Sequence, residues 1–288
     1  DFPLIENVRI HSDYLPGITS MLLTFDDNRC SWMRCRFCHH TPGHIRRKRV
    51  SPEILAADIA YYYSQGIREF YLYDNEMIPE NLTAMLHELR RQIGPVRDIC
   101  LRIFGARVDA DFSSLEPAVW KSGLIESISL GVEFYSQELL DLHEKGITLA
   151  QIDRTIQRFI DIGTQVNVYL LLGIPGEQEK HLLETRAFIE ENKSRIFFVP
   201  SFFRLSSGMA LYRQQKDFGI HVQEPYRINE MVEGSDLPPA ATRYLKFTCN
   251  DADTGQIVTR ARTAQKVRDV LGDALYLDCF MIFAERPV

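Results

Sequence analysis

Residues 166–203 read VNVYLLLGIPGEQEKHLLETRAFIEENKSRIFFVPSFF, and this stretch holds one complete strand–helix–strand unit. The apolar run 166–172 has the length of a strand and ends in a Gly-Ile-Pro-Gly turn. Residues 179–192 follow with a helical pattern, and residues 196–203 form a second apolar run. Two strands joined by a crossover helix are typical of a parallel sheet. The unit therefore predicts an α/β fold.

The same alternation extends back toward the start of the chain. Further strands are predicted at 20–25, 69–73, 100–105 and 125–130, and further helices at 79–92, 113–121, 137–144 and 149–162. Another helix opens at the start signal Ser51-Pro52-Glu53 and is closed by Gly66. Six βα repeats in about 190 residues predict a partial (β/α)6 TIM-like barrel, because a full eight-fold barrel typically needs about 250 residues.

The βα rhythm fails beyond Leu205. Glycines and prolines divide this part into short pieces, at Gly208, Gly219, Pro225, Gly234, Pro238 and Pro239. A helix near 263–271 and a strand near 275–283 are expected to finish the chain. We therefore expect an N-terminal linker segment at 1–19, a barrel core at 20–205 and a small C-terminal appendage at 206–288 that caps the barrel.

Composition and charge limit the classes of partner. Apolar residues make up 45% and charged residues 25% of the chain, and no run is long enough to cross a membrane. The net charge of −6 disfavours a nucleic-acid partner. The basic run Arg46–Arg49 is either a solvated loop or a rim for an anionic substrate. Without an initiating Met or a signal pattern, the chain is expected to be a cytoplasmic piece of a longer protein.

Three cysteines form the strongest chemical motif, Cys30-Ser-Trp-Met-Arg-Cys35-Arg-Phe-Cys38. They lie on a loop after the first predicted strand, at the end of a barrel where active sites gather. Soft thiolates suit an iron–sulfur cluster, and a missing fourth protein ligand leaves one iron open. The alternative is a zinc-stabilised interaction module without turnover, in which a histidine completes a tetrahedral site: His39, His40 or His44.

With this loop and the strand ends that follow, the sequence resembles the radical S-adenosylmethionine (SAM) superfamily over roughly residues 20–205. The resemblance implies a 4Fe–4S cluster on Cys30, Cys35 and Cys38 and an enzyme that reductively cleaves SAM to a 5′-deoxyadenosyl radical. It also implies that Phe37 lies near the adenine. Four residues rather than the commoner three separate Cys30 from Cys35, which we interpret as a one-residue insertion.

The resemblance also implies SAM contacts at the ends of the second and third strands. Asp74 stands in an Asp-Asn-Glu turn where many relatives have a Gly-Gly-Glu-like turn for the methionyl amine, so the sequence departs from that pattern. Arg107 matches an arginine that faces the methionine carboxylate in relatives, and a planar guanidinium suits that task. Its alternative role is a surface ion pair with Asp109 or Asp111.

Three more contacts are implied downstream. Glu133 closes a Gly-Val-Glu motif whose acid binds the ribose or the methionyl amine in relatives. Lys145 falls where relatives often have an arginine for the carboxylate, and Gly173 begins the turn that shapes the floor near the adenine. Glu177 is expected to order that turn rather than to react. No side chain is assigned a catalytic role.

The N-terminal edge resembles the linker that follows a cobalamin-binding domain in peptide-maturation and natural-product members. This implies cobalamin held by an upstream domain that the chain lacks, with methylation among the outcomes. A peptide or small molecule would be the substrate, and a reductase the electron donor. A degenerate homologue that binds the cluster without turnover is the remaining alternative.

Other motifs carry less weight. Asp141-Leu-His143-Glu-Lys-Gly146 matches the Asp-x-His-x-x-Gly motif of cobalamin domains. It falls on a predicted helix whose Leu139, Leu140 and Leu142 are expected to pack, so we interpret it as a chance match. Cys100 is expected to be a small core residue. Cys249 and Cys279 are too far apart in the sequence to predict an auxiliary cluster.

Overall fold

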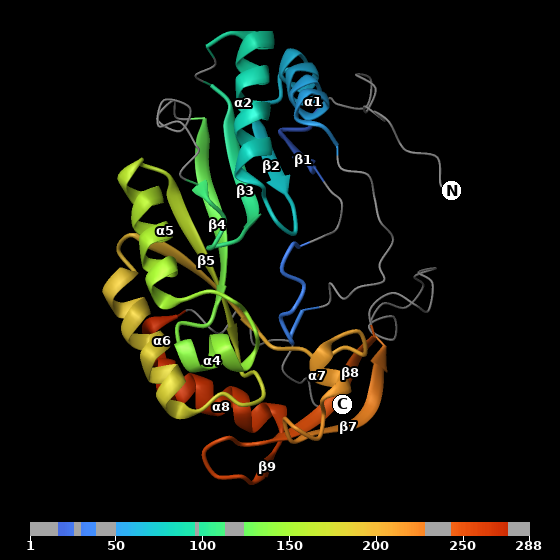
Figure 1. The fold of residues 1–288 in the computed structure, drawn as a ribbon, viewed down its shortest axis with the longest axis vertical. Coiled ribbons are helices and arrows are strands. Elements are labelled where there is room, and N and C mark those ends of the chain that lie inside the picture. The colour runs from blue at the N-terminus through green and yellow to red at the C-terminus, as the bar shows by residue number, and fades with distance from the viewer. Residues whose placement is uncertain are drawn as a thin grey trace.

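A computed structural model describes residues 17–25, 30–38, 50–95, 98–112, 124–227 and 243–275. Its centre is a six-stranded parallel sheet in which the strands follow one another in chain order (Figure 1). The strands are β1 (Ser20–Leu23), β2 (Glu69–Tyr73), β3 (Cys100–Ala106), β4 (Ile125–Glu133), β5 (Gln165–Leu172) and β6 (Ile196–Phe202). Within the described residues β1 and β6 form the two edges, so the sheet is not closed. The predicted partial barrel is confirmed.

Helices cover the outer face of this sheet (Figure 1). They are α1 (Pro52–Ser64), α2 (Pro79–Ile93), α5 (Leu149–Asp161) and α6 (Glu179–Asn192), while the short helix α4 (Gln137–Leu142) lies beyond the end of β4. The predicted start signal of α1 is present, because the Ser51 hydroxyl accepts a hydrogen bond from the Ile54 amide at 3.4 Å. Thr148 and Gln151 form a capping box at the start of α5. The helix predicted at 113–121 lies outside the described residues.

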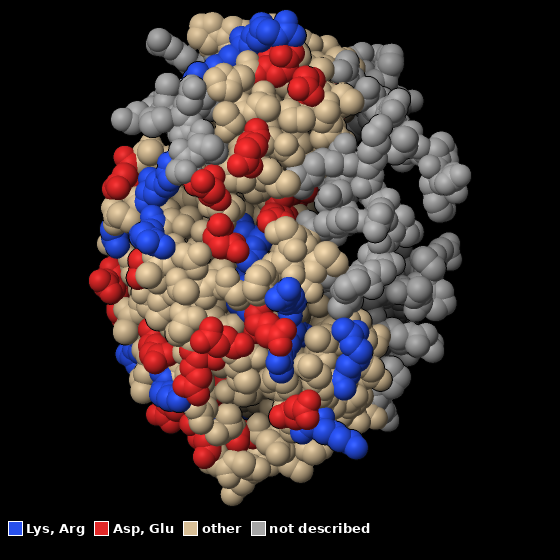
Figure 2. All heavy atoms as spheres, in the orientation of Figure 1, with Lys and Arg blue, Asp and Glu red and all other residues tan. Residues whose placement is uncertain are grey.

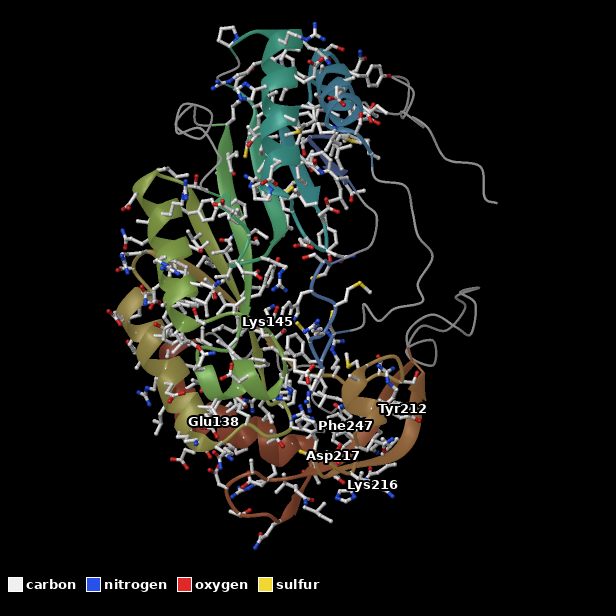
Figure 3. All side chains as sticks on the ribbon, in the orientation of Figure 1. Glu138, Lys145, Tyr212, Lys216, Asp217 and Phe247 are labelled. Atoms are coloured by element: carbon white, nitrogen blue, oxygen red, sulfur yellow. The ribbon has the colours of Figure 1, made fainter. Side chains whose placement is uncertain are left out.

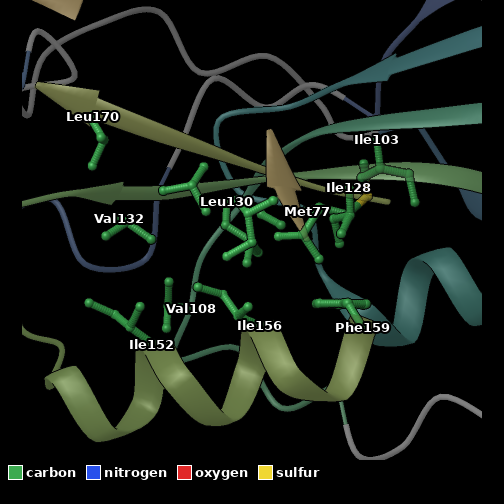
Figure 4. Close-up of a cluster of buried hydrophobic side chains, with 14 of the residues drawn as sticks. Met77, Ile103, Val108, Ile128, Leu130, Val132, Ile152, Ile156, Phe159 and Leu170 are labelled. Atoms are coloured by element: carbon green, nitrogen blue, oxygen red, sulfur yellow. The ribbon is translucent and has the colours of Figure 1, made fainter. Parts of the chain in front are cut away.

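Alternation along the strands separates an apolar face from a more polar one. In β5, Val166, Val168, Leu170 and Leu172 are buried toward the helices, whereas Asn167 and Tyr169 on the opposite face are only half-buried. Apolar side chains of β3, β4 and β5 pack on α5 in a contiguous core (Figure 4). Each large side chain buried there stabilises the fold by about 1.5–3 kcal/mol. This core holds the carboxyl ends of the strands at one edge of the sheet.

The last part of the chain is more regular than the sequence suggested. It contains α7 (Ala210–Arg213), β7 (Ile220–Arg227), β8 (Arg243–Asn250), β9 (Ile257–Val258) and α8 (Arg260–Leu271), followed by a 3-10 turn (Gly272–Ala274). The antiparallel sheet β7-β8-β9 contradicts the expected short pieces. Pro225 does not break β7, because β7 is an edge strand, where proline is tolerated.

The predicted C-terminal helix is confirmed, although α8 starts earlier, at the Thr259 cap. The strand predicted near 275–283 lies beyond the described residues except for its first residue. The expected domain boundaries at 19/20 and 205/206 stay predictions.

The small sheet and α8 pack against α6 and the end of β6. Arg260 is buried, and its Nη2 donates to the Phe203 carbonyl at 3.0 Å. Its guanidinium lies 4.3 Å and 4.7 Å from the ring centroids of Phe202 and Phe247. From the loop between β8 and β9, the Asp253 carboxylate accepts from the Glu179 amide at the start of α6, at 3.0 Å. These contacts join the C-terminal elements to the core.

Two surface features bear on the expected partners. No helix among the described residues has the length and apolar character needed to cross a membrane. Acidic and basic side chains are interspersed over the face shown in Figure 2, and the described residues form no continuous basic surface there. The basic run Arg46–Arg49 lies outside the described residues.

Candidate active site

The cysteine loop, residues 30–38, runs past the carboxyl ends of the strands toward α7 (Figure 1). Cys30, Cys35 and Cys38 are free thiols and partly accessible, and the Cys38 amide donates to the Cys35 carbonyl at 3.1 Å in a tight turn. Burial raises the pKa of Cys35 to about 11, while Lys145 and Arg107 act to lower it and the other two thiols to raise it. The three thiols thus lie close enough to interact, with two cations beside them.

Three cysteine thiols can serve as donors to an iron–sulfur cluster, and thiolates also bind zinc. In the part of the chain that the structure describes, no three His, Cys, Asp or Glu side chains are close enough to hold one ion together. Tetrahedral zinc would hold its thiolates within about 4 Å of one another. A cubane separates the sulfurs further, because each cysteine binds its own iron. The histidines of the zinc alternative, His39, His40 and His44, are not among the described residues.

Arg107 follows β3 and touches the cysteine loop. Its Nε and Nη2 each donate to the Asp109 carboxylate at 2.8 Å, and its Nη1 lies 3.7 Å from the Cys30 sulfur. The expected ion pair with Asp109 is therefore present, but it is not a surface pair, since Arg107 is only 6% exposed. Asp109 occupies one edge of the guanidinium, which leaves Nη1 directed at the loop.

Glu133 and Lys145 form a second charged pair at this edge of the sheet. The Lys145 Nζ lies 3.4 Å from the Glu133 carboxylate and 5.7 Å from the Phe37 ring centroid. Lys145 is buried, and Figure 3 shows it between α4 and the cysteine loop. Glu133 has φ 69°, next to an irregularity in the pairing of β4 with β5. The structure thus brings Phe37, Glu133 and Lys145 together.

Asp74 is buried in the turn after β2, on the same edge of the sheet. Its carbonyl oxygen would lie 1.6 Å from a Cβ at Gly105, whose φ is 82°, so only glycine lets the two turns pack. Two residues on, the Glu76 carboxylate accepts from the Ser31 hydroxyl at 2.8 Å and from the Ser31 amide. This anchor of the cysteine loop could not be predicted from the sequence, because Ser31 and Glu76 are 45 residues apart in the chain.

The turn after β5 behaves as predicted. The Glu177 carboxylate accepts from the Gly173 amide at 2.8 Å, so Glu177 orders the turn. Gly173 has φ 69°, and a Cβ there would lie 2.2 Å from the Phe202 ring. Burial raises the pKa of Glu177 to about 7, although the Gly173 amide, Arg260 and Lys266 act to lower it. Gly173 is thus fixed at the sheet edge that also carries the other predicted contacts.

The cobalamin-like motif does not lie wholly on a helix, contrary to expectation. Of the three residues that define the motif, only Asp141 belongs to α4. His143 is the C-cap residue of α4, and Gly146 lies in the following turn. Leu139 and Leu140 are buried as expected, whereas Leu142 is 37% exposed and packs only partly, with its Cδ2 against Gly176. His143 is fully buried, with ring centroids 5.4 Å from Phe134 and 5.5 Å from Phe218. The imidazole is therefore part of an aromatic core.

The isolated cysteines differ from each other. Cys100 is not a core residue as predicted: it is partly exposed, and its thiol donates to the Glu126 carboxylate at 2.7 Å. The alternation of β3 places Leu101 on the buried face and Cys100 on the opposite one. Cys249 is buried in β8. Cys279 lies outside the described residues.

An open parallel βα barrel with a cysteine loop at its carboxyl edge defines a class of cofactor-dependent enzyme domains. The model of the Radical SAM superfamily matches residues 28–189, which is more than half of the chain. The chain belongs to the radical SAM superfamily. Membership implies a 4Fe–4S cluster and SAM as cofactors.

Several solved structures share the fold. The radical SAM methyltransferase TsrM from Kitasatospora setae, with cobalamin and a 4Fe–4S cluster bound, is 16% identical, with TM-score 0.62, covering 90% of this chain and 51% of that chain. The cobalamin-dependent radical SAM enzyme OxsB with aqua-cobalamin bound is 15% identical, with TM-score 0.59, covering 86% of this chain and 41% of that chain. Another TsrM structure contains tryptophan and a SAM analogue, at 16% identity, TM-score 0.55, and 78% and 43% coverage. The search among curated proteins found no match.

The chain thus spans about half, or less, of the length of these enzymes. At this level of identity the likeness concerns the fold alone. Activity, substrate and partners of the whole protein are therefore matters for proposal.

Proposed function

We propose that this chain is the catalytic core of a radical SAM enzyme that modifies a peptide or small-molecule substrate. One observation carries the proposal: the cysteine loop lies against two buried cations, Arg107 and Lys145, at the carboxyl edge of the sheet. Three thiolates concentrate negative charge, and buried cations stabilise it strongly where water is excluded. The donor set fits a cluster with one iron free for SAM.

The chain's own residues would bind and orient SAM. Cys30, Cys35 and Cys38 would hold the cluster, which when bound supplies the electron that breaks the S–C5′ bond of SAM. Lys145 and Arg107, whose Nη1 already lies beside the Cys30 sulfur, would attract the methionine carboxylate. Glu133 would accept hydrogen bonds from the ribose or the methionyl amine. Phe37, which is partly exposed beside Lys145, would cover the adenine. Gly173 would lie in the floor of the adenine site.

Asp74 has a different role in the proposal. Its backbone carbonyl is held against Gly105 at the sheet edge, so main-chain oxygens of this turn could accept from the methionyl amine without the Gly-Gly-Glu-like sequence of relatives. Asp74 as a whole residue is only 4% exposed. We assign the amine contact to the turn rather than to the Asp74 side chain.

Cobalamin-dependent methylation is the more specific form of the proposal. It is supported by the shared fold with TsrM and OxsB and by the N-terminal sequence that resembles a linker after a cobalamin domain. Cobalamin would then be held outside this chain, and a reductase would supply the electron.

Anaerobic reconstitution with iron and sulfide tests the cluster. We expect about four irons per chain and a brown protein, and none after Cys30, Cys35 and Cys38 are all changed to Ala. Cys100→Ala is the matched control and should keep its iron, because Cys100 lies at the opposite end of β3 from Arg107. Full iron retention by the triple variant contradicts the proposal, and a colourless protein with one zinc favours the interaction module.

Calorimetric titration with SAM tests the rest of the site. Glu133→Gln and Arg107→Ala should each weaken SAM binding about tenfold or more, because each removes a charged contact. The control is Glu138→Gln on α4, whose carboxylate is exposed and pairs with Lys180. Iron content is measured in every sample. Unchanged SAM affinity in both site variants would show that the proposed position of SAM is wrong.

A further inference from the structure

The four residues between Cys30 and Cys35 fold around one large side chain, that of Trp32. Met33 has φ 48°, so the loop turns through a left-handed residue immediately after the tryptophan. Two guanidinium groups lie near the indole, with Arg34 at 5.1 Å and Arg107 at 5.7 Å from the ring centroid. Trp32 is half-buried in these contacts.

The other side of Trp32 meets the turn after α4, residues 143–146. Its Nε1 donates to the Glu144 carbonyl at 2.5 Å. A Cβ at Gly146 would lie 2.1 Å from the indole, so only glycine leaves room for the ring. Gly146 also has φ 73°, a conformation that suits glycine. The indole and the turn thus fit each other closely.

Arg36 strengthens the same junction from the far side of Cys35. Its amide donates to the His143 carbonyl at 3.0 Å, and its Nη2 contacts the Glu144 carboxylate at 2.6 Å. Residues on both sides of Cys35 are therefore bound to one turn. That turn also carries Lys145, whose Nζ reaches Glu133.

We propose that Trp32 and Arg36, bound to residues 143–146, form a clamp that sets the position of Cys35 relative to Lys145. The inference rests on the proposed cluster site. Met33, with its left-handed backbone, supplies the turn that directs the indole of Trp32 toward Gly146. His143 and Gly146 of the cobalamin-like motif then belong to the clamp.

The first experiment changes Trp32 in the reconstituted protein. A fixed concentration of iron chelator should remove the cluster from Trp32→Ala about tenfold faster than from wild type. The loss of visible absorbance measures this rate. Trp32→Ala should also alter the electron paramagnetic resonance signal of the reduced cluster and the change that SAM produces in it. Trp32→Phe keeps an aromatic ring against Gly146, so its rate of cluster loss should lie between those of wild type and Trp32→Ala. It also provides the comparison if the alanine variant does not fold.

The second experiment tests the fit between the indole and Gly146. Gly146→Ala should accelerate cluster loss in wild type, but much less in the Trp32→Ala background, where the clash is gone. Gly163→Ala is the matched control for backbone strain alone, because Gly163 has φ 81° and nothing within 4 Å of an added Cβ. Gly163→Ala should leave cluster lifetime unchanged.

Three results would overturn the clamp. They are an unchanged cluster lifetime and resonance signal in Trp32→Ala, a lower melting temperature without any change at the cluster, and additive effects of Trp32→Ala and Gly146→Ala. Failure of the proposed function is distinguishable, because the wild-type chain would then take up no iron at all.

Discussion

Glu177 shows how a single half-buried carboxyl connects the cofactor edge of the sheet to the C-terminal elements. Its carboxylate accepts from Gly173, and burial raises its pKa to about 7 against the partial compensation of Arg260 and Lys266. In the folded protein Glu177 therefore holds its proton up to a higher pH than in the unfolded chain. Stability from this group is greatest below its ordinary value of 4.5 and is lost as the pH rises toward and past 7.

Glu177→Gln is expected to remove this pH dependence. The amide oxygen can still accept from Gly173 and carries no charge at any pH. Wild type and variant should melt together at about pH 4.5, and the variant should melt at a higher temperature at about pH 8. Thermal unfolding measured across this range checks the prediction. The prediction fails if the difference in melting temperature between wild type and variant stays constant with pH, or if wild type melts higher at high pH. Either result would show that Glu177 is ionised throughout this range.

At the level of residues, the sequence located the site through strand ends. Arg107 and Glu133 follow or end their strands, and the carboxyl ends of parallel strands meet at one edge, so their proximity to the cysteine loop could be predicted. Trp32 and Glu76 could not be found this way. Their partners lie 112 and 45 residues away in the chain, and no local pattern encodes such contacts.

At the level of elements, the turn after α4 shows why a motif needs its structural context. In the match to Asp-x-His-x-x-Gly, Asp141 is exposed and accepts a hydrogen bond from Gln137, His143 is buried among aromatic rings, and Gly146 contacts Trp32. Burial lowers the pKa of His143 to about 3, so the imidazole stays neutral among aromatic rings. A cobalt ligand would have to leave this core, and the turn that holds Trp32 would have to open with it.

The chain is therefore expected not to bind hydroxocobalamin through His143. His143→Phe fills the same aromatic space and should fold, so it is a better test than an alanine that leaves a cavity. The visible spectrum of hydroxocobalamin should be the same with the wild-type chain as with this variant. Tight binding by the wild type that disappears in His143→Phe would contradict our interpretation of the motif.

The elements themselves were predictable to different degrees. The βα units were found because apolar runs alternate with helical patterns and start signals such as Ser51 mark the helices. The pair β7 and β8 was missed because Pro225 indicated a break, and proline is compatible with a strand only at a sheet edge. Which strand is an edge depends on the tertiary arrangement, and the sequence pattern does not reveal it.

At the scale of the whole molecule, Arg260 joins the small sheet to the barrel core. Its guanidinium lies between Phe202 of β6 and Phe247 of β8 and donates to the Phe203 carbonyl. A desolvated cation between two rings stabilises by about 2 kcal/mol, and a hydrogen bond from a charged group by about 1.5–3 kcal/mol. The junction thus depends strongly on one side chain.

Arg260→Ala is expected to lower the free energy of unfolding by about 2–4 kcal/mol, because it removes both interactions and leaves the Phe203 carbonyl without this donor. Arg262→Ala, an exposed position on the same helix, is the control and should change it by less than about 0.5 kcal/mol. Urea unfolding measures both. Equal changes in the free energy of unfolding at the two positions would show that the contacts of Arg260 do not stabilise the junction.

The left-handed backbone of Glu133 has a consequence for the whole fold. A non-glycine residue at φ 69° costs on the order of 1 kcal/mol, and Asn or Gly would occupy position 133 with less strain. Yet the carboxylate that reaches Lys145 exists only with glutamate there. If Glu133 holds SAM as proposed, thermal stability and cofactor affinity place opposite demands on position 133, and glutamate there favours affinity at the expense of some stability.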